Sequence, residues 1–386
     1  MTLRDVSFRA TDLSPSKIRD VAELGMGDPD VIPLWFGEAA WRSPLLAIDA
    51  AKISLDRDPT HYQPNSGLPA LREAIAGYLS ALHKVSIPAN RITVSASAMQ
   101  GLMLSAQTLT TPGDRVVMIA PDWPNIAAAF TIAGGQVEKV ALTVADGRWT
   151  LDLDELIDAL TPDTRCLMIN TPNNPTGWTL SAENRQVLLD HCRKHGIWIV
   201  ADEVYNRLYR HGTAAPSFVE ITEPEDRFIG LNSFSKAWAM TGWRLGWMVT
   251  PPELEAPLAM LTEFNIAGAP PFVQAAGVSV VSEGETFVAQ QRDRLAAGYA
   301  LVAERLGQMD RVEFIKPDGA FYAFFRIDGL NDSLETAKDI LSKTKVGLAP
   351  GIAFGEQGEG HLRLCYAQPV DLLNRALDRL EQYFRR

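Results

Sequence analysis

The feature that most constrains the fold is the alternation of short apolar strands with helical patterns between residues 65 and 280. The candidate strands are 91–95, 116–120, 165–170, 197–202 and 228–232. Strands that alternate with helices in this way predict a largely parallel sheet covered by helices on both faces. The helix before the strand at 197 is predicted over 182–195, with Ser181 as its N-cap and Gly196 as its stop.

The two ends of the chain follow a different pattern. Residues 1–45 are irregular with one early helix, and a long amphipathic helix begins near Phe287. A chain of 386 residues exceeds one typical domain. We therefore predict an α/β protein with a large domain at 46–286. A smaller α+β domain, built from 1–45 and 287–386, is expected to close over a cleft, which is a common place for a ligand.

Charge and composition exclude several classes of partner. The net charge of −11 argues against a nucleic acid or an anionic membrane, because both need a basic face. Residues 1–20 lack the apolar stretch of a secretory signal, and the apolar run at 126–133 is too short to span a bilayer. Three separated cysteines without metal-type spacing indicate reduced thiols, a cytoplasmic location and no metal site: Cys166, Cys192 and Cys365.

Five chemically useful residues follow or end predicted strands of the sheet. They are Ala98, Trp123, Asn174, Asp202 and Lys236. Open α/β sheets bind ligands at the carboxyl edge of their strands. The sequence therefore predicts that these residues surround one site.

The segment around Lys236 has the composition of a pyridoxal phosphate site. Ser233, Ser235 and Arg244 can hold a phosphate beside the lysine amine, and that amine can form a Schiff base with the cofactor aldehyde. The backbone N–H groups of Ala98 and Met99, at the start of a predicted helix, offer a second seat for the phosphate. The alternative is a solvated surface lysine.

Three further strand-end residues suit the cofactor ring. Asp202 follows a strongly apolar strand, where an unpaired carboxylate is costly, so it is expected to pair with the pyridinium nitrogen. Asn174 and Tyr205 can bind the ring oxygen, and Trp123 can stack on the ring. Taken singly, Asp202 is equally a helix N-cap and the loop around Asn174 a simple turn.

Arg363 is predicted to lie on a strand of the smaller domain, within residues 361–367. Its planar guanidinium can grip a substrate carboxylate with two hydrogen bonds. An ordinary salt-bridged strand arginine is the alternative.

Together these pieces resemble the class I/II aminotransferases of PLP fold type I, an aspartate aminotransferase-like family. The motifs NNPTG, ADEVY, SFSKAWAMTGWRLG and RLCYA occur in the family's order and with similar spacing over nearly the whole chain. The resemblance implies that Lys236 carries the cofactor and shuttles the proton, with Asp202 and Tyr205 completing the catalytic set. It also implies that Arg363 binds the substrate α-carboxylate, helped by Asn174 and the Gly37 backbone.

The same resemblance implies a homodimer with shared sites. Tyr62 looks like the tyrosine that reaches the phosphate of the neighbouring subunit. The chain departs from the family where Ser95–Ala98 replaces a glycine-containing loop, and where Met99 replaces a lysine common in bacterial aspartate-preferring relatives. The apolar surroundings of Phe36 and of residues 265–268 favour hydrophobic or aromatic donors.

The expected activity is ping-pong transamination between an L-amino acid and a 2-oxo acid. A β-lyase or a cyclopropane-forming synthase would use the same cofactor residues. Ser233-x-x-Lys236 also matches a serine hydrolase pattern, but no S-D-N or K-T-G partner motif accompanies it. A cofactor-bound regulator would need a basic DNA-binding segment, and His191 with His195 is read as a solvated helix end rather than a metal site.

Overall fold

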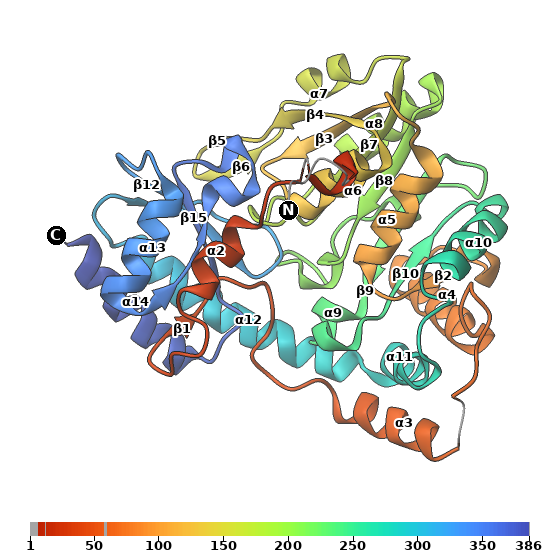
Figure 1. The fold of residues 1–386 in the computed structure, drawn as a ribbon, viewed down its shortest axis with the longest axis horizontal. Helices are drawn as coiled ribbons and strands as arrows, with labels where there is room; N and C mark the ends of the chain where they lie inside the picture. The colour runs from red at the N-terminus through yellow and green to blue at the C-terminus, as the bar shows by residue number, and fades with distance from the viewer. Residues whose placement is uncertain (1–6, 12, 58–59, 386) are drawn as a thin grey trace.

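The computed structural model describes residues 7–11, 13–57 and 60–385. Over these residues its centre is a seven-stranded sheet in the order β2, β10, β9, β8, β7, β3, β4 (Figure 1). The bounds are β2 (Ile92–Ser95), β3 (Arg115–Ala120), β4 (Gln136–Ala141), β7 (Thr164–Asn170), β8 (Trp198–Asp202), β9 (Phe228–Ser233) and β10 (Gly246–Val249). Only β10 pairs antiparallel with its described neighbours, so the predicted, largely parallel sheet is confirmed.

Helices cover both faces of this sheet because its strands are apolar on both sides. On β7, for example, Cys166 to Ile169 are all buried. The covering helices are α4 (Pro69–His83), α5 (Ala98–Leu109), α6 (Pro124–Ala133), α7 (Leu153–Ala159), α8 (Ala182–His195), α10 (Glu255–Asn265) and α11 (Pro271–Glu283). Leu102, Phe130 and Leu258 join α5, α6 and α10 to one buried cluster on a single face.

The predicted limits of α8 are confirmed. The Ser181 hydroxyl accepts a hydrogen bond from the Asn184 N–H, and Gly196 ends the helix with a φ of +69°. A side-chain acceptor at the N-cap and a left-handed residue after the last turn satisfy backbone groups that the helix leaves unpaired.

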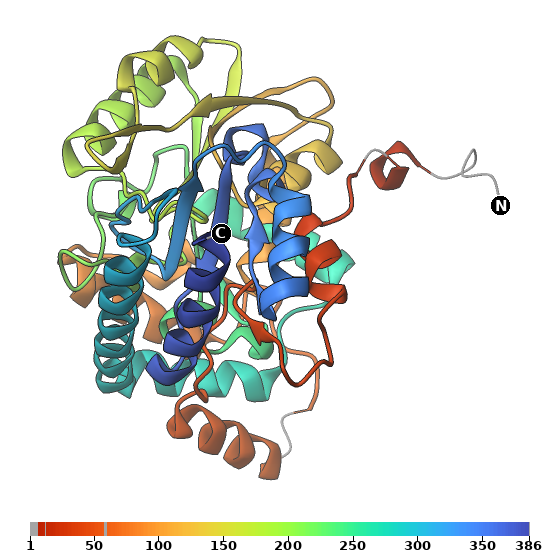
Figure 2. The same cartoon turned by 90° about the vertical axis from the view of Figure 1, so that its left-hand side faces the viewer.

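The C-terminal part of the chain forms a second layer beside the large sheet (Figures 1 and 2). A four-stranded sheet within the described residues has the order β11 (Val312–Glu313), β12 (Tyr322–Ile327), β15 (His361–Cys365) and β14 (Ala349–Pro350). The long helix α12 (Glu285–Leu306) runs between the two parts, and α13 (Ser333–Thr344) and α14 (Val370–Phe384) pack on the smaller one.

The N-terminal segment joins this smaller part. Strand β1 (Ile32–Pro33) pairs with β13 (Val346–Gly347), and α2 (Lys17–Glu23) packs against α13 and β14. The described part of residues 1–45 holds two helices, α1 (Phe8–Thr11) and α2, rather than one. The remaining α-helices and strands are α3 (Leu45–Asp56), the hairpin β5 (Thr143–Ala145) and β6 (Arg148–Thr150), and the short α9 (Phe234–Ala237). The domain limits at residues 46 and 286 stay a prediction.

Among the described helices, none combines the length and the apolar character that crossing a membrane requires.

Candidate active site

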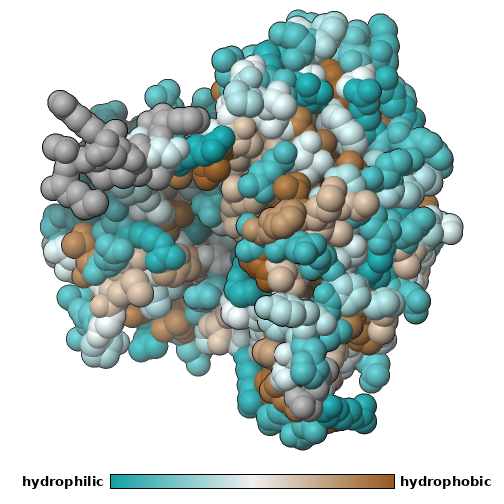
Figure 3. Space-filling model, turned by 45° about the vertical axis from the view of Figure 1, so that its right-hand side comes forward, coloured by the Kyte–Doolittle hydropathy of each residue, from teal (hydrophilic) through white to brown (hydrophobic). Residues whose placement is uncertain are grey.

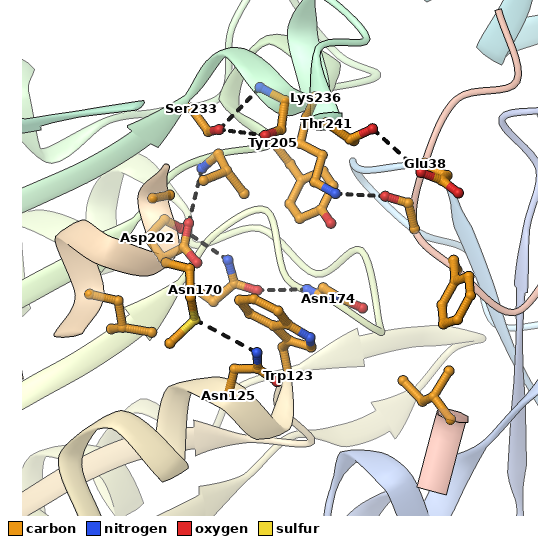
Figure 4. Close-up of a pocket in the computed structure, with 18 of the residues that line it drawn as sticks. Glu38, Trp123, Asn125, Asn170, Asn174, Asp202, Tyr205, Ser233, Lys236 and Thr241 are labelled. Carbon is orange, nitrogen blue, oxygen red and sulfur yellow. Dashed lines mark hydrogen bonds between the residues drawn. The ribbon is translucent and has the colours of Figure 1, made fainter. Parts of the chain in front are cut away.

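A cavity of about 630 Å³ lies where β7, β8 and β9 end (Figure 4). Twelve of the thirteen predicted site residues line it: Gly37, Ala98, Met99, Trp123, Asn174, Asp202, Tyr205, Ser233, Ser235, Lys236, Arg244 and Arg363. The exception is Tyr62, whose side chain is 91% exposed on this chain. Parallel strands that end at one edge thus bring together residues that are far apart in sequence.

Lys236 lies on α9, immediately after β9. Its Nζ donates a hydrogen bond of 2.6 Å to the carbonyl oxygen of Gly37, so the amine points across the cavity. Burial lowers the pKa of Lys236 to about 8, because the charged form loses solvation. A substantial neutral fraction at mildly alkaline pH makes the amine a nucleophile and a base.

Asp202 ends β8 and is buried beside the cavity. Its Oδ1 accepts a hydrogen bond from the Val204 N–H at 3.2 Å, and no described side chain forms an ion pair with it. Burial raises the pKa of Asp202 to about 7. A buried carboxylate that faces a cavity without a cationic partner suits a ligand that supplies one, such as a protonated ring nitrogen.

Asn174 and Arg363 are joined directly. The Arg363 Nη1 donates to the Asn174 Oδ1 at 2.7 Å, and its Nη2 donates to the Trp35 carbonyl. The amide nitrogen of Asn174 therefore remains available to a ligand. Asn170 steadies this arrangement, because its Oδ1 accepts from the Asn174 N–H at 2.7 Å and its Nδ2 donates to the Asp202 carbonyl at 3.0 Å.

The opposite end of the cavity is built for an anion. Ser233 contacts Ser235 through their hydroxyls at 2.9 Å, and the Arg244 Nη1 donates to the Thr241 carbonyl at 2.5 Å. Ser97 caps α5 with a φ of +95°, a conformation that favours glycine. The loop therefore keeps a glycine-like shape without glycine. Ala98 and Met99, the first two residues of α5, line the cavity, and the first turn of a helix leaves backbone N–H groups unpaired within the helix.

The charge of the cavity differs from that of the whole chain. Its lining carries four cationic side chains, Arg19, Lys236, Arg244 and Arg363, against two carboxylates, Glu38 and Asp202. Local positive charge in an acidic protein favours anionic ligands. The hydrogen-bond donors around Ser233 and Arg244, together with the buried carboxylate of Asp202, fit a phosphate-bearing cationic heterocycle.

Several lining residues were not predicted from the sequence. They include Ser16, Ile18, Arg19, Glu38, Asn170 and Tyr322. Asn170 ends a predicted strand, and this position was a usable signal. Tyr322 lies on β12, at the start of a strand of the other layer, so only the fold reveals its proximity. Residues 265–268, by contrast, are absent from the lining of this cavity.

The three cysteines are free and buried. Within the described residues, no group of three or more histidine, cysteine or acidic side chains could hold a metal ion. His191 and His195 lie with ring centroids 4.6 Å apart, and the His191 Nε2 bonds the Leu160 carbonyl.

Comparison with known proteins shows that this chain is similar to enzymes. The family model "Aminotransferase class I and II" matches residues 30–380. An aspartate aminotransferase of Pyrococcus horikoshii is 32% identical, covering 98% of this chain and 96% of the relative. Aromatic-amino-acid aminotransferase 2 of Thermococcus litoralis is 33% identical, covering 98% and 97%. The solved structure of an alanine aminotransferase from Pyrococcus furiosus superposes with a TM-score of 0.91 at 26% identity, covering 98% of this chain and 99% of that one.

Proposed function

The chain belongs to the class I and II aminotransferases and has their PLP type I fold, and from this premise we propose how it transfers amino groups. We propose that the cavity binds pyridoxal 5′-phosphate through Lys236 and that the reaction is a ping-pong exchange between an L-amino acid and a 2-oxo acid. The family supports this cofactor. The observation that carries the proposal is the placement of a neutralisable amine and an unpaired buried carboxylate around one cavity.

The residues present fit each part of the cofactor. Ser233, Ser235, Arg244 and the N–H groups of Ala98 and Met99 would hold the phosphate, because arginine and helix-end donors bind dianions well. Asp202 would face the ring nitrogen, Asn174 and Tyr205 the ring oxygen, and Trp123 the ring face. When bound, the cofactor supplies an aldehyde that reacts with amines and a cationic ring that accepts electrons.

The remaining chemistry falls to the side chains of this chain. In its neutral form the Lys236 Nζ accepts the α-proton of the amino acid, and the lowered pKa keeps that form available near pH 8. Asp202 stays ionised when a cation lies beside it. Tyr205 and Asn174 orient the ligand, so that the proton is moved at a fixed position.

Arg363 is proposed to bind the α-carboxylate that donor and acceptor share. It is buried, with 2% exposure, and its guanidinium packs against the aromatic rings of Tyr322 and Phe354.

Ile18, Phe36, Met99 and Leu102 form an apolar part of the cavity wall. We propose that this wall favours hydrophobic or aromatic donors, although the relatives compared above carry the names of three different amino-acid substrates.

Replacing Arg363 with lysine is expected to raise KM for both substrates about a hundredfold, because lysine cannot make two parallel bonds to a carboxylate. The affinity for pyridoxal phosphate should stay within threefold. The matched control is Arg244→Lys, which should weaken cofactor binding and leave KM at saturating cofactor nearly unchanged. Steady-state kinetics and equilibrium titration measure the two quantities. An unchanged KM in Arg363→Lys would remove the carboxylate role.

We propose a homodimer that shares its sites. Large apolar side chains are exposed on this chain, including Phe264 at 86%, Tyr62 at 91% and Met260 at 56%. In Figure 3, which turns the side carrying α4 and α10 forward, brown and tan residues gather in the middle of the face. Asn265 accepts from Gln100 on α5 at 3.2 Å, so this surface adjoins the phosphate end of the cavity. A partner covering it would bring its own Tyr62 near the phosphate.

Replacing Phe264 with glutamate is expected to raise the dimer dissociation constant about a hundredfold, because a charge would be buried in an apolar interface. Val187→Glu is the control, since Val187 is 46% exposed on α8, away from α10. Sedimentation velocity over a concentration series measures the effect. A wild-type protein that sediments as a monomer at all concentrations would refute the dimer.

A donor screen decides the reaction. Purified protein with pyridoxal phosphate is incubated with single amino acids and 2-oxoglutarate, and 2-oxo acid formation is followed. Acceptor-dependent product, fastest with hydrophobic or aromatic donors, is the expected result. Pyruvate and ammonia formed without an acceptor would favour a β-lyase instead.

We also propose a cytoplasmic location for the protein. A smaller domain, formed from 1–45 and 287–386, is proposed to close over the site.

A further inference from the structure

Tyr322 is a buried cavity residue to which the proposed function gives no role. It begins β12, it is fully buried, and it is among the residues that line the cavity. Its neighbours come from three distant segments that carry Tyr205, Gly37 and Arg363. Tyr322 therefore lies between Tyr205, which is proposed to bind the cofactor ring oxygen, and Arg363, which is proposed to bind the substrate carboxylate.

The geometry around Tyr322 is tight. Its Oη lies 2.6 Å from the Oη of Tyr205. A Cβ added to Gly37 would lie 1.9 Å from the same Tyr322 oxygen, so only glycine fits beside it. The Arg363 Cζ lies 4.4 Å from the centroid of the Tyr322 ring, a distance typical of a cation–π contact.

Which of the two tyrosines donates the hydrogen bond between them follows from the number of protons that they carry. Burial raises the pKa of both phenols, so each hydroxyl keeps its single proton. If Tyr205 donates its proton to the ring oxygen of the cofactor, only Tyr322 can donate in the bond between them. In the part of the chain that the structure describes, Tyr205 is the one hydrogen-bond partner of the Tyr322 hydroxyl.

We propose that Tyr322 is a positioning residue with two separable roles, an inference that rests on the proposed function. Its hydroxyl donates to Tyr205, and this aims the Tyr205 hydroxyl at the cofactor ring oxygen. Its ring supports the Arg363 guanidinium. Hydrogen bonds in a chain polarise one another, so the donation also makes Tyr205 a stronger donor.

Two substitutions separate these roles. Tyr322→Phe removes the hydroxyl and keeps the ring, while Tyr322→Leu removes both. The readout is the pH midpoint of the visible absorbance of bound pyridoxal phosphate, measured without substrate. When Tyr205 donates a weaker hydrogen bond, more negative charge remains on the ring oxygen of the cofactor. The proton bound beside that oxygen is then lost at a higher pH. Tyr322→Phe should therefore raise the midpoint by roughly 0.3 pH units, and Tyr205→Phe by about 1.5.

The ring role is measured by kinetics. Tyr322→Leu should raise KM for both substrates about tenfold, the loss expected for a desolvated cation–π contact. Tyr322→Phe should leave KM within twofold of wild type. Tyr366→Phe is the control, because it also removes a buried hydroxyl, bonded to the Ala320 carbonyl, yet lies outside the cavity lining. It should move neither quantity.

A double-mutant cycle decides whether Tyr322 acts through Tyr205. In the Tyr205→Phe background, adding Tyr322→Phe should produce no further shift of the midpoint. An equal shift in both backgrounds, or no shift in the single variant, would overturn the proposal while the visible band itself persists. A wild-type protein without a visible band would instead overturn the proposed function, and the positioning role with it. Thermal unfolding of each variant establishes that it is folded.

Discussion

Replacing Lys236 with alanine is expected to lower kcat at least about 10⁴-fold, the largest loss of any single substitution in this protein. Under the proposed function, the variant loses both the amine that attaches the cofactor and the group that moves the α-proton, and general base catalysis alone contributes up to about 10⁴-fold. Single-turnover kinetics with saturating cofactor and donor measure this loss. The Lys236 amine donates a hydrogen bond to the Gly37 carbonyl and lies 5.6 and 5.8 Å from the ring centroids of Tyr205 and Phe321.

Two controls make this result specific. Lys84→Ala removes an exposed lysine beyond the end of α4 and should leave kcat unchanged. Addition of a small primary amine to Lys236→Ala should restore part of the lost rate, because the cavity has room for a soluble base. If Lys236→Ala keeps more than a tenth of the activity, the amine is not the proton carrier.

The second large effect is expected at Asp202. The substitution Asp202→Asn keeps the shape and removes the charge that faces the cavity, so the cationic ring would lose its partner. Breaking a buried charge pair costs about 3–5 kcal/mol, which corresponds to a fall in kcat/KM of roughly 10³-fold. Stopped-flow kinetics with a fast donor measure this change.

The neighbouring carboxylate provides the matched control. Glu203 is also buried, but it bonds the Ser217 hydroxyl and the Phe218 N–H and does not line the cavity. Glu203→Gln should therefore lower kcat/KM less than tenfold, mainly through stability. Equal losses in Asp202→Asn and Glu203→Gln would mean that burial rather than the ring explains the Asp202 effect.

Much of the fold could be predicted because its strands carry local signals. The apolar runs of β7 and β8 and the caps of α8 appear in consecutive residues. Strands β4 and β10 were not predicted because their local signals are weak. Strand β4 lies at the sheet edge and its sequence QVEKVA has neither an apolar run nor a regular alternation, while β10 has only four residues and is antiparallel to both neighbours.

The candidate site was predictable where a residue ends a strand of the parallel sheet. Asp202, Asn174 and Lys236 reach one cavity because the sheet aligns the strand ends. Tyr322 was missed, since its contact with Tyr205 spans 117 residues and joins two layers of the molecule. Tyr62 was predicted from a resemblance alone, and a single chain leaves it on the surface.

The most direct test of the central claim is to find where the cofactor attaches. The protein is saturated with pyridoxal phosphate, reduced with borohydride, digested and mapped by mass spectrometry. The account predicts one stoichiometric pyridoxyl adduct, on the peptide that contains Lys236, and loss of that adduct in Lys236→Ala. An adduct on another lysine at equal yield, or none at saturation, would contradict it.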